Sequence, residues 1–254
     1  MYRNIRLIES LKNIVKSGKK KNLIKKRRAF YLQFLKPGDL YFDVGANYGN
    51  RIEPLMGEGI TIIAVEPQVP CVKYLRRKFK NNITVIPCGL AEKKGIRKLY
   101  ISNASPLSSF SIEWINATRQ SGRFGKYKWH KEQPTEMETL DNLIKKYGKP
   151  QFIKIDVEGY EYEVLKGLSQ PVSMLSFEYT IPERKQSIVD CIERVTRLAN
   201  NKKVLFNYSA GETMEWAMDE WVNPDQMKEE IELDRFVQSE FGDIYANMNV
   251  KDET

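Results

Sequence analysis

Short apolar runs of strand length alternate along most of this chain with longer segments whose apolar residues recur at helical spacing. Before residue 36, the apolar positions instead follow two helical stripes, one over residues 2–16 and a second ending near Leu35. Beyond it, the pattern predicts strands at 40–44, 61–65, 83–86, 151–156, 172–178, 203–208 and 243–247. It predicts helices at 49–57, 69–80, 139–147, 160–168, 183–200 and 224–240. This alternation is typical of an α/β sheet with helices on both faces.

One long segment interrupts the alternation. A short strand is expected at Tyr100 and Ile101, but residues 103–135 are rich in Ser, Gly and aromatic residues and predict only one short helix, at 111–120. Long irregular segments inside compact domains often act as lids over functional sites. We therefore expect this segment to fold over a ligand.

The net charge of +8 is concentrated at one end of the chain. Residues 1–28 hold eleven Lys or Arg and one acid, whereas the rest holds 30 basic and 32 acidic residues. We therefore divide the chain into a basic helical extension, 1–36, and a single α/β domain, 37–254. The extension predicts contact with an anionic membrane surface, a lipid-linked glycan or nucleic acid. The alternative is a helix that packs its apolar stripe on the domain or on a second subunit. We expect cofactor binding to survive removal of residues 1–28.

The remaining composition points to the cytoplasm. Cys71, Cys88 and Cys191 are odd in number and far apart, which argues against a disulfide framework and a cysteine metal cluster. No apolar run has the length of a membrane span, and no secretory signal core follows the first charges. We expect a cytoplasmic protein, with attachment to the inner membrane face as an alternative. Nucleic acid is disfavoured as a partner, because no RNA-binding module is recognisable and the domain is not basic.

The most concentrated motif follows the strand at 40–44. Asp43 precedes Gly45 and Gly49, two glycines four residues apart that predict a tight turn opening a helix. The next strand ends in Glu66, whose carboxylate can accept both hydroxyls of a ribose. A dinucleotide site would show G-x-G-x-x-G around a pyrophosphate, whereas an acid leading into G-x-x-x-G suits a ligand with a cationic end. S-adenosylmethionine fits, since it carries an amino group, a sulfonium and a ribose, but no phosphate.

A second group of acids follows the strand at 151–156. Asp156 and Glu158 stand at the strand end, and Glu178 ends the next strand. Such acids can bind a hydroxylated substrate, accept its proton or hold a divalent metal through oxygen, or they can simply start a helix. His130 is the only histidine and lies in the irregular segment, so it is the other candidate for the base.

Together these motifs resemble the FkbM-type methyltransferases, a family of S-adenosylmethionine-dependent O-methyltransferases. The resemblance rests on residues 42–49, 66–67, 152–159, 163–167 and 177–178. It implies a Rossmann-like class I methyltransferase fold, with a mostly parallel seven-stranded sheet whose last strand is antiparallel. It also implies a small-molecule or glycan acceptor, because many members act on hydroxyls of glycans or secondary metabolites. An RNA methyltransferase, a non-catalytic nucleotide-binding module of the same fold and a nucleotide-dependent dehydrogenase remain the alternatives.

The resemblance also implies which residues surround the cofactor. It assigns Asp43, Gly45, Ala46, Asn47 and Gly49 to the methionine end, Glu66 and Pro67 to the ribose, Cys88, Gly89 and Leu90 to the adenine, and Ser108 and Ser109 to a segment approaching the cofactor. Asp156 and Glu158 would face the methyl group and the acceptor. The strand end lacks the Asn/Asp-Pro-Pro-aromatic signature of many amine methyltransferases, which favours an oxygen acceptor. Whether a side chain or a divalent cation activates the hydroxyl stays open.

Overall fold

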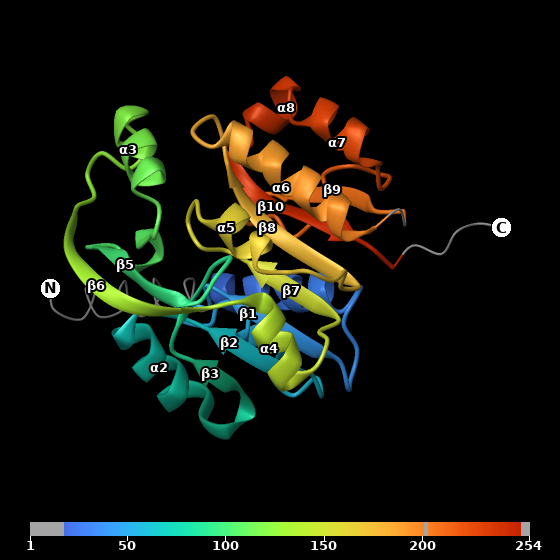
Figure 1. The fold of residues 1–254 in the computed structure, drawn as a ribbon. Helices are drawn as coiled ribbons and strands as arrows, with labels where there is room; N and C mark the ends of the chain where they lie inside the picture. Colours follow the sequence, from blue (N-terminus) through green and yellow to red (C-terminus); the bar gives the residue numbers. More distant parts are fainter. Residues whose placement is uncertain (1–17, 201–202, 250–254) are drawn as a thin grey trace, which may run out of the picture.

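Seven strands form the central sheet of the computed structural model, which describes residues 18–200 and 203–249 (Figure 1). The strands are β1 (Leu40–Val44), β2 (Thr61–Val65), β3 (Thr84–Ile86), β7 (Phe152–Ile155), β8 (Met174–Thr180), β9 (Leu205–Ala210) and β10 (Phe241–Asn247). Their order is β3-β2-β1-β7-β8-β10-β9, and β10 runs antiparallel to both of its neighbours while the other pairs are parallel. The predicted fold is confirmed, including the antiparallel last strand.

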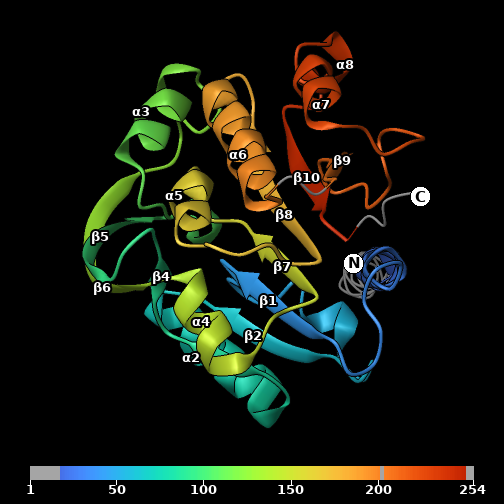
Figure 2. The same ribbon diagram turned by 45° about the vertical axis from the view of Figure 1, so that its right-hand side comes forward.

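Helices cover both faces of this sheet (Figure 2). One face carries α4 (Leu140–Tyr147), α5 (Glu161–Lys166) and α6 (Lys185–Leu198), and the other carries α2 (Val69–Phe79) and a helix over residues 18–31. Side chains alternate along each strand, so Phe42 and Val44 join the core under α6 while Tyr41 joins the core on the opposite face. Both cores are apolar, which explains why the strands read as continuous apolar runs.

The helix over residues 18–31 packs on the sheet through its last turn. Phe30 and Tyr31 are buried, with their ring centroids 5.4 Å from Tyr245 and 5.9 Å from Phe152, respectively. Residues 18–31 of the extension therefore pack apolar side chains on the domain, as one of the alternatives predicted. The helix predicted over residues 2–16 lies outside the described residues, and the boundary at residue 36 stays a prediction.

A second, three-stranded sheet lies beside the first. Its order is β4-β6-β5, formed by β4 (Gly89–Leu90), β5 (Gly95–Ser102) and β6 (Trp129–Glu138). The short strand and the short helix expected near it are confirmed, as β5 and α3 (Ile112–Gln120). The prediction that residues 103–135 are irregular is wrong at their end, because β6 begins at Trp129. Seven of the ten residues of β6 are polar and five are exposed, so its sequence shows no strand pattern, and its antiparallel pairing with β5 is what makes it a strand.

Two predicted helices are also wrong in part. Residues 49–57 form turns with a single 3-10 segment, Glu53–Leu55, instead of an α-helix. Pro54 has no amide hydrogen to donate, and Gly57 has a φ of +85°, so neither continues a helix. The helix predicted over 224–240 is divided into α7 (Pro224–Glu230) and α8 (Asp234–Val237), because Leu233 between them has an extended backbone.

Candidate active site

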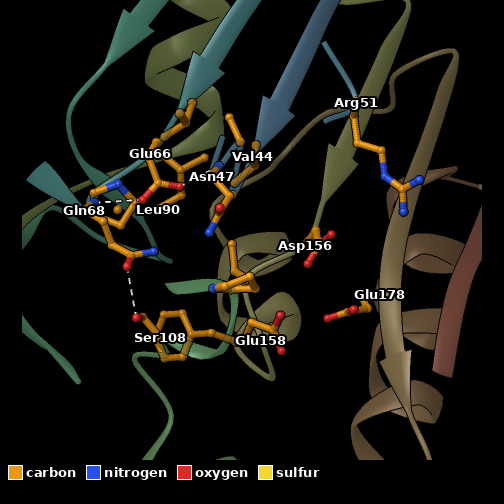
Figure 3. A pocket seen from close by; sticks show the side chains of 18 of the residues that line it. Val44, Asn47, Arg51, Glu66, Gln68, Leu90, Ser108, Asp156, Glu158 and Glu178 are labelled. Atoms are coloured by element: carbon orange, nitrogen blue, oxygen red, sulfur yellow. Dashed lines mark hydrogen bonds between the residues drawn. The ribbon is translucent and has the colours of Figure 1, made fainter. Parts of the chain in front are cut away.

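A cavity of about 270 Å³ opens where β1, β2 and β7 end (Figure 3). Its walls include three chain segments that are far apart in sequence: the turn after β1, the residues that end β2 and the residues that follow β7. It is lined by most of the predicted cofactor residues, namely Gly45, Ala46, Asn47, Glu66, Pro67, Cys88, Gly89, Leu90 and Asp156. The parallel strands bring these residues together because their carboxyl ends share one edge of the sheet.

Gly45 lets the turn after β1 touch the residue that follows β7. Its φ is +85°, and a Cβ built at this position would lie 1.7 Å from the backbone oxygen of Asp156. No other residue type fits there without moving one of the two strand ends. The requirement for glycine therefore comes from the close approach of two strand ends as well as from backbone conformation.

Glu66 is fixed at the end of β2 by two backbone amides. Its Oε2 accepts a hydrogen bond from the Asn47 amide at 2.7 Å, and its Oε1 accepts one from the Gln68 amide at 2.8 Å. The side chain is 2% exposed, and burial raises its pKa to about 7. Each carboxylate oxygen keeps a lone pair, so the group can still accept hydrogen bonds from two ligand hydroxyls.

Three carboxylates converge at the opposite side of the cavity. Asp156, Glu158 and Glu178 each offer an oxygen within 4.8 Å of the others, and Figure 3 shows their side chains turned toward one another. Burial acts to raise the pKa of Asp156, but the charge of Lys154, whose Nζ lies 2.6 Å from its Oδ2, holds that pKa below its ordinary value.

The other two acids of this cluster behave differently. Burial, followed by repulsion from Asp156, raises the pKa of both Glu158 and Glu178 well above the ordinary value. Glu158 also has a φ of +55°, in the left-handed region that non-glycine residues rarely adopt. Carboxyl groups this close must bind a proton or a cation, so the cluster can receive a proton or coordinate a divalent metal through oxygen.

The sequence of residues 43–203 matches the family model described as the methyltransferase FkbM domain. The chain belongs to the FkbM methyltransferase family. This match covers more than half of the chain, and it includes both the glycine turn and the acids that follow β7. S-adenosylmethionine is therefore the methyl donor, in agreement with the prediction.

Solved structures give weaker likenesses to this FkbM methyltransferase. A TehB-like SAM-dependent methyltransferase from Corynebacterium glutamicum is 10% identical with a TM-score of 0.47, and the alignment covers 95% of this chain and 96% of that one. An rRNA methylase from Streptococcus thermophilus is 9% identical with a TM-score of 0.43, over 87% and 92% of the two chains. Scores this low carry no argument about function, and the fold assignment rests on the strand order. A search of curated proteins finds no match.

Two residues assigned to the methionine end do not line the cavity of this methyltransferase. Asp43 is buried on β1 outside the lining, and its Oδ1 accepts a hydrogen bond from the Tyr41 hydroxyl at 3.0 Å. Gly49 packs against Phe79, where a Cβ would approach the ring to 2.5 Å. Gly49 closes the turn that carries Asn47, because its amide donates to the Ala46 backbone oxygen at 2.7 Å.

Ser109 and His130 also lie outside the cavity lining. The Ser109 hydroxyl donates to the backbone oxygen of Glu158 at 2.6 Å, so it anchors the turn of the acid cluster. Its neighbour Ser108 lines the cavity instead, where its hydroxyl donates to Gln68 Oε1 at 3.0 Å. His130 is exposed on β6, and its role as the base stays a prediction without a cavity contact to support it.

A groove of about 630 Å³ runs next to the cavity, between β5 and the segment that begins α5. Phe110 and Tyr160 line both spaces, and their ring centroids lie 5.6 Å apart. Aromatic and charged side chains alternate along the rest of the groove, including Tyr100, Tyr162, Arg97, Arg184 and Glu113. Sequence patterns gave no signal for it, since its residues come from four separate segments.

Proposed function

We propose that this protein transfers the methyl group of S-adenosylmethionine to a hydroxyl of a glycan or of a secondary metabolite. The observation that carries the proposal is the carboxylate cluster of Asp156, Glu158 and Glu178, on the wall of the same cavity as Glu66. A hydroxyl loses its proton as it attacks, so transfer to oxygen needs an acceptor for that proton beside the methyl group. An amine with a free lone pair has less need of one.

The cavity has the donor and acceptor groups that the methyl donor requires. Glu66 would accept hydrogen bonds from the ribose hydroxyls, and Leu90 with Leu99 and Phe110 would contact the adenine through apolar surface. Bound S-adenosylmethionine supplies an activated methyl group on a sulfonium. The contribution of the protein is alignment, which is worth about 7–11 kcal/mol in favourable cases.

The acid cluster would receive the proton of the acceptor hydroxyl. Lys154 keeps Asp156 ionised, so its carboxylate can accept the proton, while burial and the charge of Asp156 raise the pKa of the neighbouring glutamates well above the ordinary value. The same three oxygens could instead hold a divalent cation that lowers the pKa of the hydroxyl. The two mechanisms use the same residues and differ in their response to chelation.

The groove beside the cavity supports a saccharide or a similar polyol as the acceptor. Tyr100, Phe110 and Tyr162 offer flat apolar faces, and Arg97 and Arg184 offer hydrogen-bond donors. The surface of a sugar ring likewise alternates between apolar carbon faces and hydroxyls, which suits aromatic residues mixed with polar groups. The shared wall of Phe110 and Tyr160 would let an acceptor hydroxyl approach the acid cluster.

The test is a turnover assay on the full chain with S-adenosylmethionine and a panel of polyols, saccharides and RNA. We expect mass spectrometry to find a methyl group added to a hydroxyl, with loss of transfer in Asp156→Asn. Methyl transfer to RNA alone would favour the RNA methyltransferase, and donor binding with no transfer to any acceptor would favour the non-catalytic module. Loss of activity on chelation, restored by Mg²⁺, would assign the cluster to a cation.

The location of the protein is a separate proposal. No helix within residues 18–200 and 203–249 combines the length and apolar character needed to cross a membrane. We propose that the protein acts in the cytoplasm at the inner membrane face, with its basic residues 1–28 against anionic lipid or a lipid-linked glycan. Equal recovery in the supernatant with and without anionic vesicles after sedimentation would refute the membrane contact.

A further inference from the structure

Two arginines and one glutamate line the cavity at the side away from Glu66. The Glu212 carboxylate accepts hydrogen bonds from both terminal nitrogens of Arg51, at 2.7 and 3.0 Å. Arg27 donates to the same carboxylate at 3.0 Å and to the backbone oxygen of Asn50 at 3.3 Å. All four residues line the cavity, and they come from the N-terminal helix, the turn after β1 and the segment after β9.

The burial of these arginines suggests a role in binding. The side chain of Arg27 is only 10% exposed, and that of Arg51 is 12% exposed. Burying a guanidinium is costly unless its N–H donors have hydrogen-bond acceptors. Arg27 Nε is buried and has no hydrogen-bond partner among the described residues. Because a guanidinium has five N–H donors, each arginine keeps donors beyond those that Glu212 occupies.

The charges at this end match the amino-acid end of the methyl donor. That end carries one carboxylate and one ammonium, and the cavity lining offers two guanidiniums with the Glu212 carboxylate between them. Asp243, which lies 3.7 Å from Arg51, is buried outside the lining and also pairs with Lys154 at 3.5 Å, so it does not occupy the ligand-facing side.

Figure 3 shows Glu66 and Gln68 at one side of the pocket, Arg51 at the other, and Asp156 nearer to Arg51. A donor held at its ribose by Glu66 would therefore extend its methionine part past Asp156 toward the arginines.

We propose that Arg27 and Arg51 bind the carboxylate of S-adenosylmethionine while Glu212, whose side chain is 47% exposed, receives its ammonium. The proposal rests on the methyl donor of the proposed function and is independent of the acceptor. It makes the N-terminal helix part of the cofactor site. It thereby replaces the expectation from the sequence that residues 1–28 are dispensable for cofactor binding.

The test compares two ligands in calorimetric titrations of the full chain. S-adenosylhomocysteine has the amino-acid end, and 5′-methylthioadenosine has the same nucleoside without it. For Arg27→Ala we expect at least about a tenfold loss of affinity for S-adenosylhomocysteine and an unchanged affinity for 5′-methylthioadenosine. Arg51→Lys, which keeps the charge but loses the two-point geometry, should show the same selective loss.

Lys26→Ala is the matched control, because Lys26 is exposed on the same helix and pairs with Glu215 at 3.0 Å. It should leave the affinity for both ligands unchanged. The proposal is overturned if Arg27→Ala binds S-adenosylhomocysteine as the parent does, or if it loses both ligands equally, which would indicate a structural role. A parent protein that binds neither ligand would instead refute the cofactor site itself.

Discussion

Replacing Glu66 by glutamine removes the negative charge at the end of β2 while keeping the shape of the side chain. In the native protein each carboxylate oxygen accepts one backbone amide, from Asn47 at 2.7 Å and from Gln68 at 2.8 Å. Glutamine has one oxygen, so its NH₂ group must face one of these two amides. The side chain then loses its second acceptor, and with it the ability to receive both hydroxyls of the ribose.

The expected magnitude follows from those hydrogen bonds. A hydrogen bond to a charged group contributes about 1.5–3 kcal/mol, and the ribose would donate two. We expect Glu66→Gln to weaken binding of S-adenosylhomocysteine by about 3 kcal/mol, which is roughly 150-fold in Kd. Only the ionised carboxylate of Glu66 can accept both ribose hydroxyls, so the difference in affinity between the native protein and Glu66→Gln should depend on pH.

The sign of the pH dependence follows from the raised pKa of about 7. Protonation removes the acceptor, so the affinity of the native protein should fall as the pH is lowered through 7. The folded-state pKa lies above the unfolded value of 4.5, so the free energy of unfolding without ligand should fall as the pH rises from 4.5 to about 7. The pKa shift of Glu66 corresponds to a decrease of about 3 kcal/mol in the free energy of unfolding over this pH range.

Calorimetric titration with S-adenosylhomocysteine at pH 6 and pH 8 measures both effects. The native protein should bind about 140-fold more tightly than Glu66→Gln at pH 8 and only about 14-fold more tightly at pH 6, because about a tenth of Glu66 is ionised at the lower pH. Glu220→Gln, an exposed substitution of the same kind, is the control and should match the native protein at both values. A Glu66→Gln variant that binds within threefold of the native protein at pH 8 would refute the role of Glu66.

Three further substitutions test other parts of the site. Gly45→Ala should lower the free energy of unfolding by at least about 3 kcal/mol in urea denaturation, because its Cβ would overlap the Asp156 backbone oxygen; a loss below about 1 kcal/mol would contradict this. Asp156→Asn should lower kcat by at least about 100-fold, measured as release of S-adenosylhomocysteine, and full activity would remove it from the site. His130→Ala should leave kcat unchanged, and a hundredfold drop would restore it as the base.

The sequence predicted the central sheet and the part of the cavity around Gly45 and Glu66, because short stretches of neighbouring residues determine both. Parallel strands are buried on both faces and read as continuous apolar runs. The turn at Gly45 and the acid at Glu66 stand directly at strand ends, where the sheet topology makes them meet. Glu158 follows β7 by the same rule. Glu178 lies within β8 instead of at its predicted end, and it meets the other acids because β8 continues beyond the level at which β7 ends.

What the sequence did not predict depends on contacts between distant segments. Arg27 and Glu212 are separated by 185 residues and meet only after the N-terminal helix packs on the sheet. Strand β6 has no alternating apolar pattern and is ordered by its pairing with β5. Asp43 was assigned to the cofactor from its place in the motif, but its side chain lies outside the cavity lining, on the face of β1 that also carries Tyr41, whose hydroxyl donates to it. A pattern in the chain specifies that a residue ends a strand more reliably than it specifies where the side chain points.

The most direct test of the central claim is a crystal structure of the full chain with S-adenosylhomocysteine bound. We predict ribose hydroxyls within hydrogen-bond distance of the Glu66 carboxylate, the adenine beside Leu90, and the sulfur nearest to Asp156. A ligand bound elsewhere, or bound in this cavity with its ribose away from Glu66, would contradict the account.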